Sequence, residues 1–352
     1  VTGVQTCALP ICREFIRWDE KRREYENQTG PVRKGIGMAI FCYKTGVYPI
    51  SLETASCRMI LNQDGSMQLQ MGATEIGQGA DTVFTQMAAE VTGITEDKVN
   101  VLSTQDTDVS PFDTGAYASR QTYVSGMAVK KTGAIFKEKI LDYAAYMLEK
   151  PQDTLDVRDN HIVDKETGTQ LLPMEELATT AFYSLDRSVH ITAEATSHCK
   201  TNTFATGACF AEVEVDMPLG KVKVTNIVNV HDSGKLINPK LAAAQVHGGM
   251  SMGLGYGLSE ELLFDAKGRP LNDNLLDYKL PTAMDTPDLN ALFVELDDPT
   301  GPFGNKALGE PPAIPVAPAV RNAVLNATGV AVDSLPMDPQ KMVKHFKEAG
   351  LI

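Results

Sequence analysis

The same order of elements occurs twice in the chain, and this repetition constrains the fold more than any other feature. In the first half, apolar segments at Cys57–Leu61 and Met67–Met71 flank the turn-forming run Asn62–Ser66, and a glycine-rich loop then leads into an amphipathic segment, Asp81–Thr92. The corresponding segments of the second half are Ala208–Val215, Asp216–Gly220, Val222–Val230 and Leu241–Leu258. A hairpin followed by a helix, rather than strands joined only by crossovers, favours an α+β fold of two similar lobes with a ligand between them.

The remaining segments set the expected boundaries. Residues 12–34 are expected to form an N-terminal helix around the charged stretch Arg13–Gln28. Residues 35–190 are then the first lobe and residues 191–352 the second. Further elements are predicted as strands at Gly35–Tyr43 and Val99–Thr104, a long helix at Thr122–Leu148 and a hairpin within Pro151–Gly168.

The first residues, Val1–Ile11, resemble the translation of a common DNA-sequencing adapter and are expected to lie outside the fold. They are too short to span a bilayer, and they lack the basic start of a secretory signal. On this interpretation the natural protein extends further upstream, and the chain is its C-terminal part.

Composition narrows the class of protein. A net charge of −13 with no long basic run argues against nucleic acid as a partner, although local backbone dipoles can still hold one small anion. No stretch approaches 18 consecutive apolar residues, so a globular, cytoplasmic protein without a membrane span is expected.

The cysteines are Cys7, Cys12, Cys42, Cys57, Cys199 and Cys209. Because the last four form no C-x-x-C pair, buried reduced thiols are expected rather than zinc or iron–sulfur ligands.

Two loops precede predicted helices. The run Gly72–Gly79 has the spacing G-x-x-x-x-G-x-G, which is neither the dinucleotide fingerprint nor the phosphate loop. It ends at a helix start, where free N–H groups bind anions, so it is either a phosphate or pyrophosphate site or a tight turn. Gln78 adds an amide that both donates and accepts. The loop Asp113–Thr122 has a similar arrangement and is a second candidate anion-binding edge, although Arg120 alone also fits a surface charge.

Gly249, Gly253 and Gly257 recur every four residues within Leu241–Leu258. On a helix this spacing places them on one bare stripe, which lets another backbone or a ligand approach closely. The sequence does not decide between these two.

Glu310 lies between Gly309 and two prolines, Pro311 and Pro312. The prolines fix φ and lack N–H donors, so the carboxylate is held in place. With apolar neighbours such as Leu308 and Ile314 to desolvate it, the carboxylate suits a general base. The same residues also fit a structural role, because an acid before a proline-started helix is a favourable charge near the helix dipole.

Four motifs, taken together in this order, carry a family resemblance. They are Gly72-Ala-Thr-Glu-Ile-Gly-Gln-Gly79, Gly115-Ala-Tyr-Ala-Ser-Arg120, Ala243-Ala-Gln-Val-His-Gly-Gly249 and Lys306-Ala-Leu-Gly-Glu-Pro-Pro312. From about Gly35 to its end, the chain resembles the C-terminal cofactor region of the xanthine dehydrogenase/aldehyde oxidase family of molybdenum hydroxylases. Within that family the likeness is greatest to the separate molybdenum-binding subunits of bacterial xanthine dehydrogenases.

The resemblance implies a role for each matching residue. It implies that Glu310 is the active-site base and that the amide of Gln245 lies near the molybdenum, which is held through the pterin without a direct protein ligand. The residues that it implies to contact or wrap the pterin dinucleotide are Gly77, Gln78, Gly79, Ala118, Ser119 and Arg120.

The resemblance also implies an activity. A purine such as hypoxanthine or xanthine is hydroxylated with water as the oxygen source, on a molybdenum–molybdopterin cofactor in the cytosine dinucleotide form. Electrons then pass to partner subunits that carry [2Fe-2S] clusters and FAD. The family's upstream elements, including its substrate-gripping arginine and phenylalanine, are not found here, so the purine assignment rests on overall likeness. The alternatives are a relative that acts on another N-heterocycle or an aldehyde, and a non-catalytic cofactor-binding or assembly subunit. Glu310 argues against a non-catalytic subunit, because a protein that only holds the cofactor needs no general base.

Overall fold

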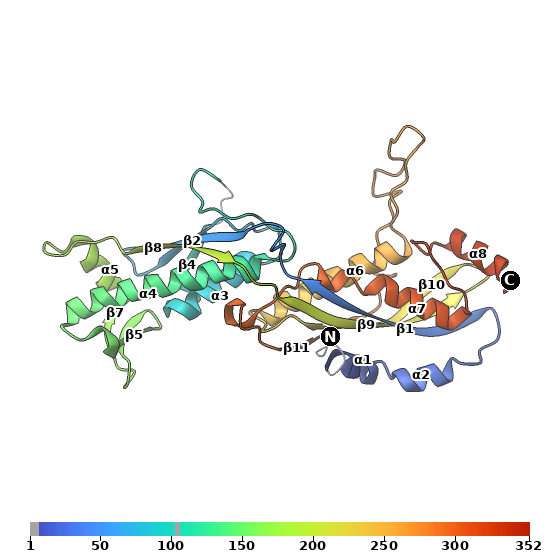
Figure 1. Cartoon of the computed structure of the whole chain (residues 1–352), viewed down its shortest axis with the longest axis horizontal. Coiled ribbons are helices and arrows are strands. Elements are labelled where there is room, and N and C mark those ends of the chain that lie inside the picture. The colour runs from blue at the N-terminus through green and yellow to red at the C-terminus, as the bar shows by residue number, and fades with distance from the viewer. Residues whose placement is uncertain (1–6, 103–105) are drawn as a thin grey trace. The chain divides into compact units, whose positions relative to one another are not determined.

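The computed structural model describes residues 7–102 and 106–352, which form two compact units (Figure 1). Unit 1 comprises the residues up to Tyr43, Phe204–Leu296 and Ala307–Ile352, and unit 2 comprises Lys44–Thr203 and Asp297–Lys306. These units differ from the contiguous lobes expected from the sequence. The expected boundary at residue 190 falls inside unit 2, because the strand that follows it, β8, pairs with β2.

Unit 1 is built on a four-stranded sheet in the order β1-β9-β10-β11. Strands β9 and β10 pair antiparallel, and β11 adds to β10 in parallel. The strands are β1 Val32–Lys44, β9 Phe204–Asp216, β10 Lys221–Asp232 and β11 Leu289–Val294. The helices are α1 Leu9–Phe15, α2 Trp18–Glu24, α6 Pro239–Leu258, α7 Val316–Thr328 and α8 Pro339–Glu348, with the short 3-10 turn η6 at Pro311–Ala313.

Helices cover both faces of this sheet, as Figure 1 shows. On one face, Ile227 of β10 packs with Val246 of α6 and Val320 of α7. On the other face, Val228 packs with Cys12 of α1. Adjacent residues of a strand point to opposite faces, so a strand buried on both sides reads as a nearly continuous apolar run.

The N-terminal segment departs from the prediction. Ala8 is buried and Leu9 packs against the same apolar cluster, so the expectation that Val1–Ile11 lies outside the fold is wrong for these two residues. Residues 1–6 lie outside the described part of the chain. The single helix expected within residues 12–34 is two helices, because Arg17 adopts a left-handed φ of 59° between them.

Unit 2 contains a four-stranded sheet in the order β4-β3-β2-β8 and a small sheet in the order β5-β6-β7. The helix α4 lies along the larger sheet, against β2 and β8 (Figure 1). The strands are β2 Glu53–Leu61, β3 Met67–Met71, β4 Val99–Leu102, β5 Leu155–Arg158, β6 His161–Asp164, β7 Gln170–Pro173 and β8 Thr192–Cys199. The helices are α3 Ala80–Thr92, α4 Gly126–Leu148 and α5 Met174–Tyr183, with 3-10 turns at Glu96–Lys98, Gln152–Thr154 and Pro302–Gly304.

The predicted repeat is confirmed. In unit 2, the hairpin β2–β3 leads into α3 and then into β4, which pairs parallel with β3. In unit 1, the hairpin β9–β10 leads into α6 and then into β11, which pairs parallel with β10. The α+β class and the two similar lobes are therefore as the sequence indicates.

Three further details bear on the predictions. The strand expected to reach Thr104 is described only as far as Leu102, since residues 103–105 lie outside the described part. The long helix starts with a π-helical turn at Gln121–Ser125, so regular α-helix begins only at Gly126. Within the described residues, every helix is too short or too polar to cross a membrane.

Candidate functional site

Glu310 lies in unit 1 immediately before η6, and its carboxylate accepts a hydrogen bond from the hydroxyl of Tyr43 at the end of β1. The side chain makes no capping hydrogen bond to η6, which begins with two prolines that lack N–H donors. The expected desolvation is not found, because Glu310 is exposed and Ile314 is 43% exposed. The proline rings after Glu310 turn into the core and leave its carboxylate on the solvent side.

The glycine stripe of α6 packs against the segment that carries Glu310. A Cβ added at Gly249 would lie 2.5 Å from Cβ of Pro312, and one added at Gly253 would lie 2.6 Å from Cβ of Val316. Of the two readings of the stripe, close approach of a neighbouring backbone is therefore confirmed. From the sheet, the side-chain amide of Asn229 donates to the carbonyl of Pro312 at 3.0 Å. Helix and sheet thus hold the turn after Glu310 from two sides.

Gln245 lies one helical turn before Gly249, and residues four apart on a helix share a face. Its side chain therefore lies on the face of α6 that packs against η6. It is half-buried, and its amide makes no hydrogen bond to any of the described residues. Unit 1 thus places an amide with unused donor and acceptor groups on the same side of α6 as the Glu310 turn.

A row of buried polar side chains starts at Asn229, which contacts this turn, and was missed by sequence reasoning. Among the described residues, Oδ1 of Asn229, both ring nitrogens of His231 and Oγ of Ser233 are buried without a hydrogen-bond partner. Alternate residues of β10 share one sheet face, the face of Ile227 and α6. Unsatisfied buried polar atoms of this kind are ordinarily bridged by water or a bound ligand. These residues could have been found from the sequence, because they are polar at positions where the alternation of the strand predicts buried apolar side chains.

His231 packs between two aromatic rings, with its centroid 4.9 Å from that of Phe41 and 6.4 Å from that of Phe293. Burial lowers the pKa of His231 to about 3, so the ring is neutral at physiological pH.

In unit 2, the glycine loop Gly72–Gly79 does hold an anion, but that anion is the loop's own Glu75. The Glu75 carboxylate accepts hydrogen bonds from the N–H groups of Gly77 at 2.7 Å, Gly79 at 3.1 Å and Asp81 at 3.0 Å. Partial burial opposes ionisation, yet these N–H groups together keep the pKa of Glu75 below its ordinary value. The expected phosphate position at the start of α3 is therefore occupied by a side chain.

Gln78 joins the two loops that the sequence singled out. Its amide oxygen accepts from the N–H of Ile76 at 2.7 Å, and its amide nitrogen donates to Oε1 of Gln121 at 2.7 Å. Gly77–Gly79 and Ala118–Arg120 are consequently brought side by side. A Cβ added at Gly77 or Gly115 would meet no atom within 4 Å, so the backbone of both loops is open to a neighbouring molecule.

Arg120 is not a surface charge or an open anion site. Its side chain is fully buried and forms ion pairs with Glu53 and, at 2.6 Å, with Asp113. It also donates to the carbonyls of Thr54 and Gly115, each at 2.8 Å. The guanidinium therefore fastens its own loop to the start of β2. Arg120 can therefore affect a bound cofactor only indirectly, through the shape of that loop.

The residues just before Arg120 have unusual backbone conformations. Ala118 has a φ of 45° and Ser119 a φ of 51°, in the left-handed region that non-glycine residues rarely adopt. The carbonyl of Ala118 accepts from the N–H of Gly46 at 2.9 Å, which helps to hold this turn. Strained backbone and π-helical turns recur at functional sites, and here they are consecutive.

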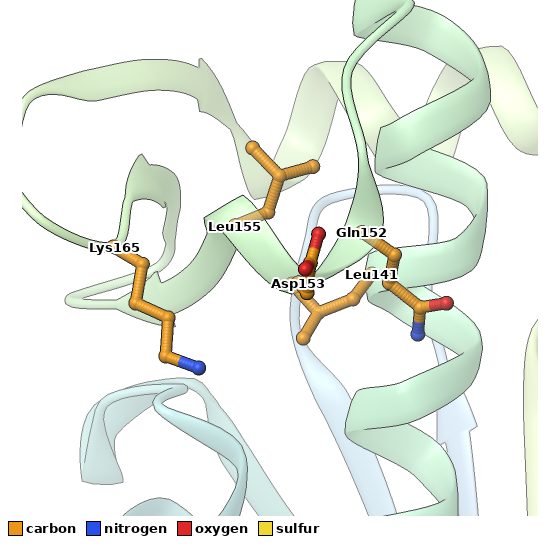
Figure 2. Close-up of a pocket in the computed structure, with 5 residues that line it drawn as sticks. All are labelled: Leu141, Gln152, Asp153, Leu155 and Lys165. Carbon is orange, nitrogen blue, oxygen red and sulfur yellow. The ribbon is translucent and has the colours of Figure 1, made fainter.

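A pocket of about 470 Å³ lies elsewhere in unit 2, and Figure 2 shows its lining. The lining residues are Leu141, Gln152, Asp153, Leu155 and Lys165. None of the residues singled out from the sequence lines it, and Lys165 and Asp153 are its only charged groups. This pocket is not the candidate site.

Comparison with known proteins decides the family. Residues 11–287 match the molybdopterin cofactor-binding domain. The chain belongs to this family. It is 47% identical, over 99% of its length, to the putative xanthine dehydrogenase molybdenum-binding subunit of Escherichia coli K12, and covers 47% of that protein. It is 33% identical, over 97% of its length, to the probable hypoxanthine oxidase of the same organism, and covers 35% of it.

The fold of this molybdopterin-binding chain is similar to that of quinoline 2-oxidoreductase from Pseudomonas putida 86. The TM-score is 0.88 at 25% identity, over 97% of the present chain and 45% of the other. The chain spans less than half the length of the relatives that it matches.

Proposed function

We propose that the chain is the cofactor-binding, C-terminal part of the molybdenum subunit of a xanthine dehydrogenase-type enzyme that hydroxylates hypoxanthine or xanthine with water as the oxygen source. One observation carries the proposal. Glu310 is held by Tyr43 and by a turn clamped between Asn229 and Gly249, and the uncommitted amide of Gln245 lies on the same face of α6. A fixed base and a free hydrogen-bonding group are what this chemistry requires of the protein.

The residues present fit a pterin cofactor. Open backbone at Gly77 and Gly115 allows a flat ring system to approach, and Nε2 of Gln121 is buried without a partner among the described residues. The left-handed turn at Ala118–Ser119 and the bond from Gln78 to Gln121 fix the shape of this edge. Gly77–Gly79 and Ala118–Arg120 are the proposed pterin-binding loops, and Gln245 is the proposed contact near the metal. We propose the cytosine dinucleotide form of the cofactor.

The bound cofactor supplies oxygen transfer and accepts the two electrons of the oxidation. The role of Glu310 is to accept a proton at its carboxylate as the reaction begins. Tyr43 donates to that carboxylate and limits its rotation. Asn229 and the α6 glycines keep the backbone of the turn from shifting, because a misplaced base loses much of its effect.

The proposal includes partner subunits and a location. Among the described residues there is no group of three or more His, Cys, Asp or Glu placed to hold a metal ion. Similarity to a protein named as a separate molybdenum-binding subunit supports the proposal that [2Fe-2S] clusters and FAD are carried by other subunits of a cytoplasmic complex. Molybdenum is assigned to the pterin, without a direct protein ligand.

The test uses the complete enzyme with its partners. Molybdenum and pterin content are measured first, and turnover of xanthine is then compared with that of nicotinate and an aromatic aldehyde. Turnover of xanthine well above the other two supports the purine assignment. A preparation that holds the cofactor but oxidises none of the three contradicts a catalytic role.

A second candidate is hydroxylation of another N-heterocycle. The specific observation in its favour is the fold similarity to quinoline 2-oxidoreductase, whose name states a different heterocycle. Preferential turnover of nicotinate in the same assay favours this candidate over the purine enzyme.

A further inference from the structure

An arm projects from unit 1 between the end of α6 and the start of β11, and Figure 1 shows it as the orange-brown excursion beyond Leu258. Not one residue from 261 to 288 is buried. Leu275 is 80% exposed and Met284 is 90% exposed. The other large apolar side chains exposed on the arm are Leu262, Leu263, Phe264, Leu271, Leu276 and Leu280. Single exposed apolar residues are ordinary, but such a concentration marks an interaction surface.

Local hydrogen bonds, rather than an apolar core, give the arm its shape. The N–H of Leu271 donates to the carbonyl of Leu263 at 2.8 Å, and Asn272 bonds across the same hairpin to Leu263 and Glu261, at 2.8 and 2.7 Å. At the base, Lys341 of α8 pairs with Glu261 at 2.9 Å. Ordering a backbone costs about 1–2 kcal/mol per residue, and burial of apolar surface ordinarily offsets that cost. The arm lacks this burial in the chain as given.

The arm belongs to the family's domain, because the family match runs from residue 11 to residue 287 and so includes almost all of it. In both kinds of relative the matching region is less than half of a longer chain, at 47% of the Escherichia coli subunit and 45% of the quinoline enzyme. We infer that the arm docks on the remaining part of the same polypeptide, which the chain as given does not include.

Charge argues against a second copy of the arm as the occupant. Between residues 260 and 288 there are seven acidic and three basic residues, so two arms placed against each other would repel. A surface that fits the arm is apolar at its centre and carries lysine or arginine at its rim. A surface on the same polypeptide also has a high effective concentration, so docking needs no additional partner.

The test is cysteine labelling of the complete subunit, with its full natural N-terminus. In a background with exposed Cys42 replaced by serine, Leu275→Cys and Met284→Cys are each treated with a maleimide, and the parent without an added cysteine gives the background rate. Leu219→Cys is the matched control, because Leu219 lies in the β9–β10 turn of the same unit and is 64% exposed. Docking predicts that the two arm cysteines react at least about tenfold more slowly than the control, at every protein concentration.

Three results overturn the inference. Arm cysteines that react as fast as the Leu219→Cys control show that the arm stays uncovered. Protection that disappears on dilution identifies a second copy as the occupant. Protection that appears only after the flavin and iron–sulfur subunits are added identifies a partner subunit. Two probe positions keep the test decisive if one replacement prevents folding, and the readout does not depend on the identity of the substrate.

Discussion

At the scale of single residues, a substitution of Glu310 distinguishes a catalytic role of its carboxylate from a purely structural one. In the complete enzyme, Glu310→Gln keeps the shape of the side chain and its bond to Tyr43 but removes proton acceptance. Turnover per bound molybdenum is expected to fall by about 10²–10⁴-fold, with cofactor content near that of the wild type. A variant that keeps more than about a tenth of wild-type turnover contradicts the assignment as base.

His231 gives a second prediction at this scale, one of pH dependence. Its pKa is about 3 when folded and 6.5 in its ordinary state, so below pH 6.5 the unfolded chain binds a proton that the folded chain does not. The contribution of His231 to stability is thus fully present above pH 6.5 and is lost progressively as the pH falls towards 3. The slope is at most about 1.4 kcal/mol per pH unit.

The variant His231→Phe removes this titration and keeps a ring against Phe41 and Phe293. Urea unfolding of both proteins from pH 8 to pH 4 measures the effect. At pH 8 the difference between them reports packing alone. Below pH 6.5 the wild type is expected to lose stability more steeply than the variant, and parallel curves would show that His231 is not protected from protonation.

At the same scale, the sequence predicted effects of neighbouring residues but not contacts between residues that are far apart in the chain. The fixed backbone position of Glu310 follows from its neighbours in the chain, because prolines restrict the backbone locally. The burial of Arg120 does not, because its partner Glu53 lies 67 positions away. Tyr43 was missed for the same reason, since its bond to Glu310 spans 267 positions. The expectation of buried cysteines is confirmed for Cys57 and Cys209 but is wrong for Cys42, which is exposed, and Cys199 is only partly buried.

At the scale of elements, the contact between α6 and the Glu310 turn is tested by two neighbouring glycines. Gly249→Ala places a Cβ 2.5 Å from Pro312, whereas Gly248→Ala meets no atom within 4 Å. The first is expected to destabilise the chain by about 1–3 kcal/mol, through overpacking. The second is expected to be neutral or stabilising by up to about 1 kcal/mol, because alanine favours a helix. Thermal unfolding compares them, and equal effects would rule out a clamp by the glycine stripe.

The loop that carries Ala118 and Ser119 depends on buried charge. Arg120→Leu leaves Glu53 and Asp113 buried without their cation, and is expected to cost about 3–5 kcal/mol of stability. The control is Arg58→Leu, which removes an exposed ion pair with Glu194 and is expected to cost at most about 1 kcal/mol. Urea unfolding followed by circular dichroism distinguishes the two. Similar costs would mean that the Arg120 network does not fix the loop.

Elements were predicted well wherever a pattern is local. The hairpins, α3, α6 and the glycine stripe follow from alternation and spacing within one segment. The Glu75 carboxylate binds N–H groups of its own loop, Gly72–Gly79, so this contact is also local. The sequence prediction nevertheless considered only an external phosphate at that position. The order of strands in the two sheets could not be predicted in this way, because β1 and β8 pair with strands that are distant in the sequence.

At the scale of the whole molecule, the two units share one plan, a hairpin followed by a helix and a parallel strand, but carry different chemistry. Unit 2 holds the proposed pterin loops, which are built on the Gln78–Gln121 bond and the Arg120 network. Unit 1 holds the proposed base and the amide of Gln245. A repeated fold with divergent loops is expected when binding and proton transfer are divided between the two copies.

The proposed function assigns electron transfer to partner subunits that carry FAD and [2Fe-2S] clusters. Purified with its full natural N-terminus but without partners, the subunit is expected to hold molybdenum and yet fail to reduce NAD, because electrons cannot leave the site at a useful rate. Adding the FAD and iron–sulfur subunits is expected to restore NAD reduction with xanthine. The measurements are metal content, visible absorbance and NADH formation. Iron–sulfur absorbance from this polypeptide alone, or NAD reduction without partners, would refute the proposed division of labour.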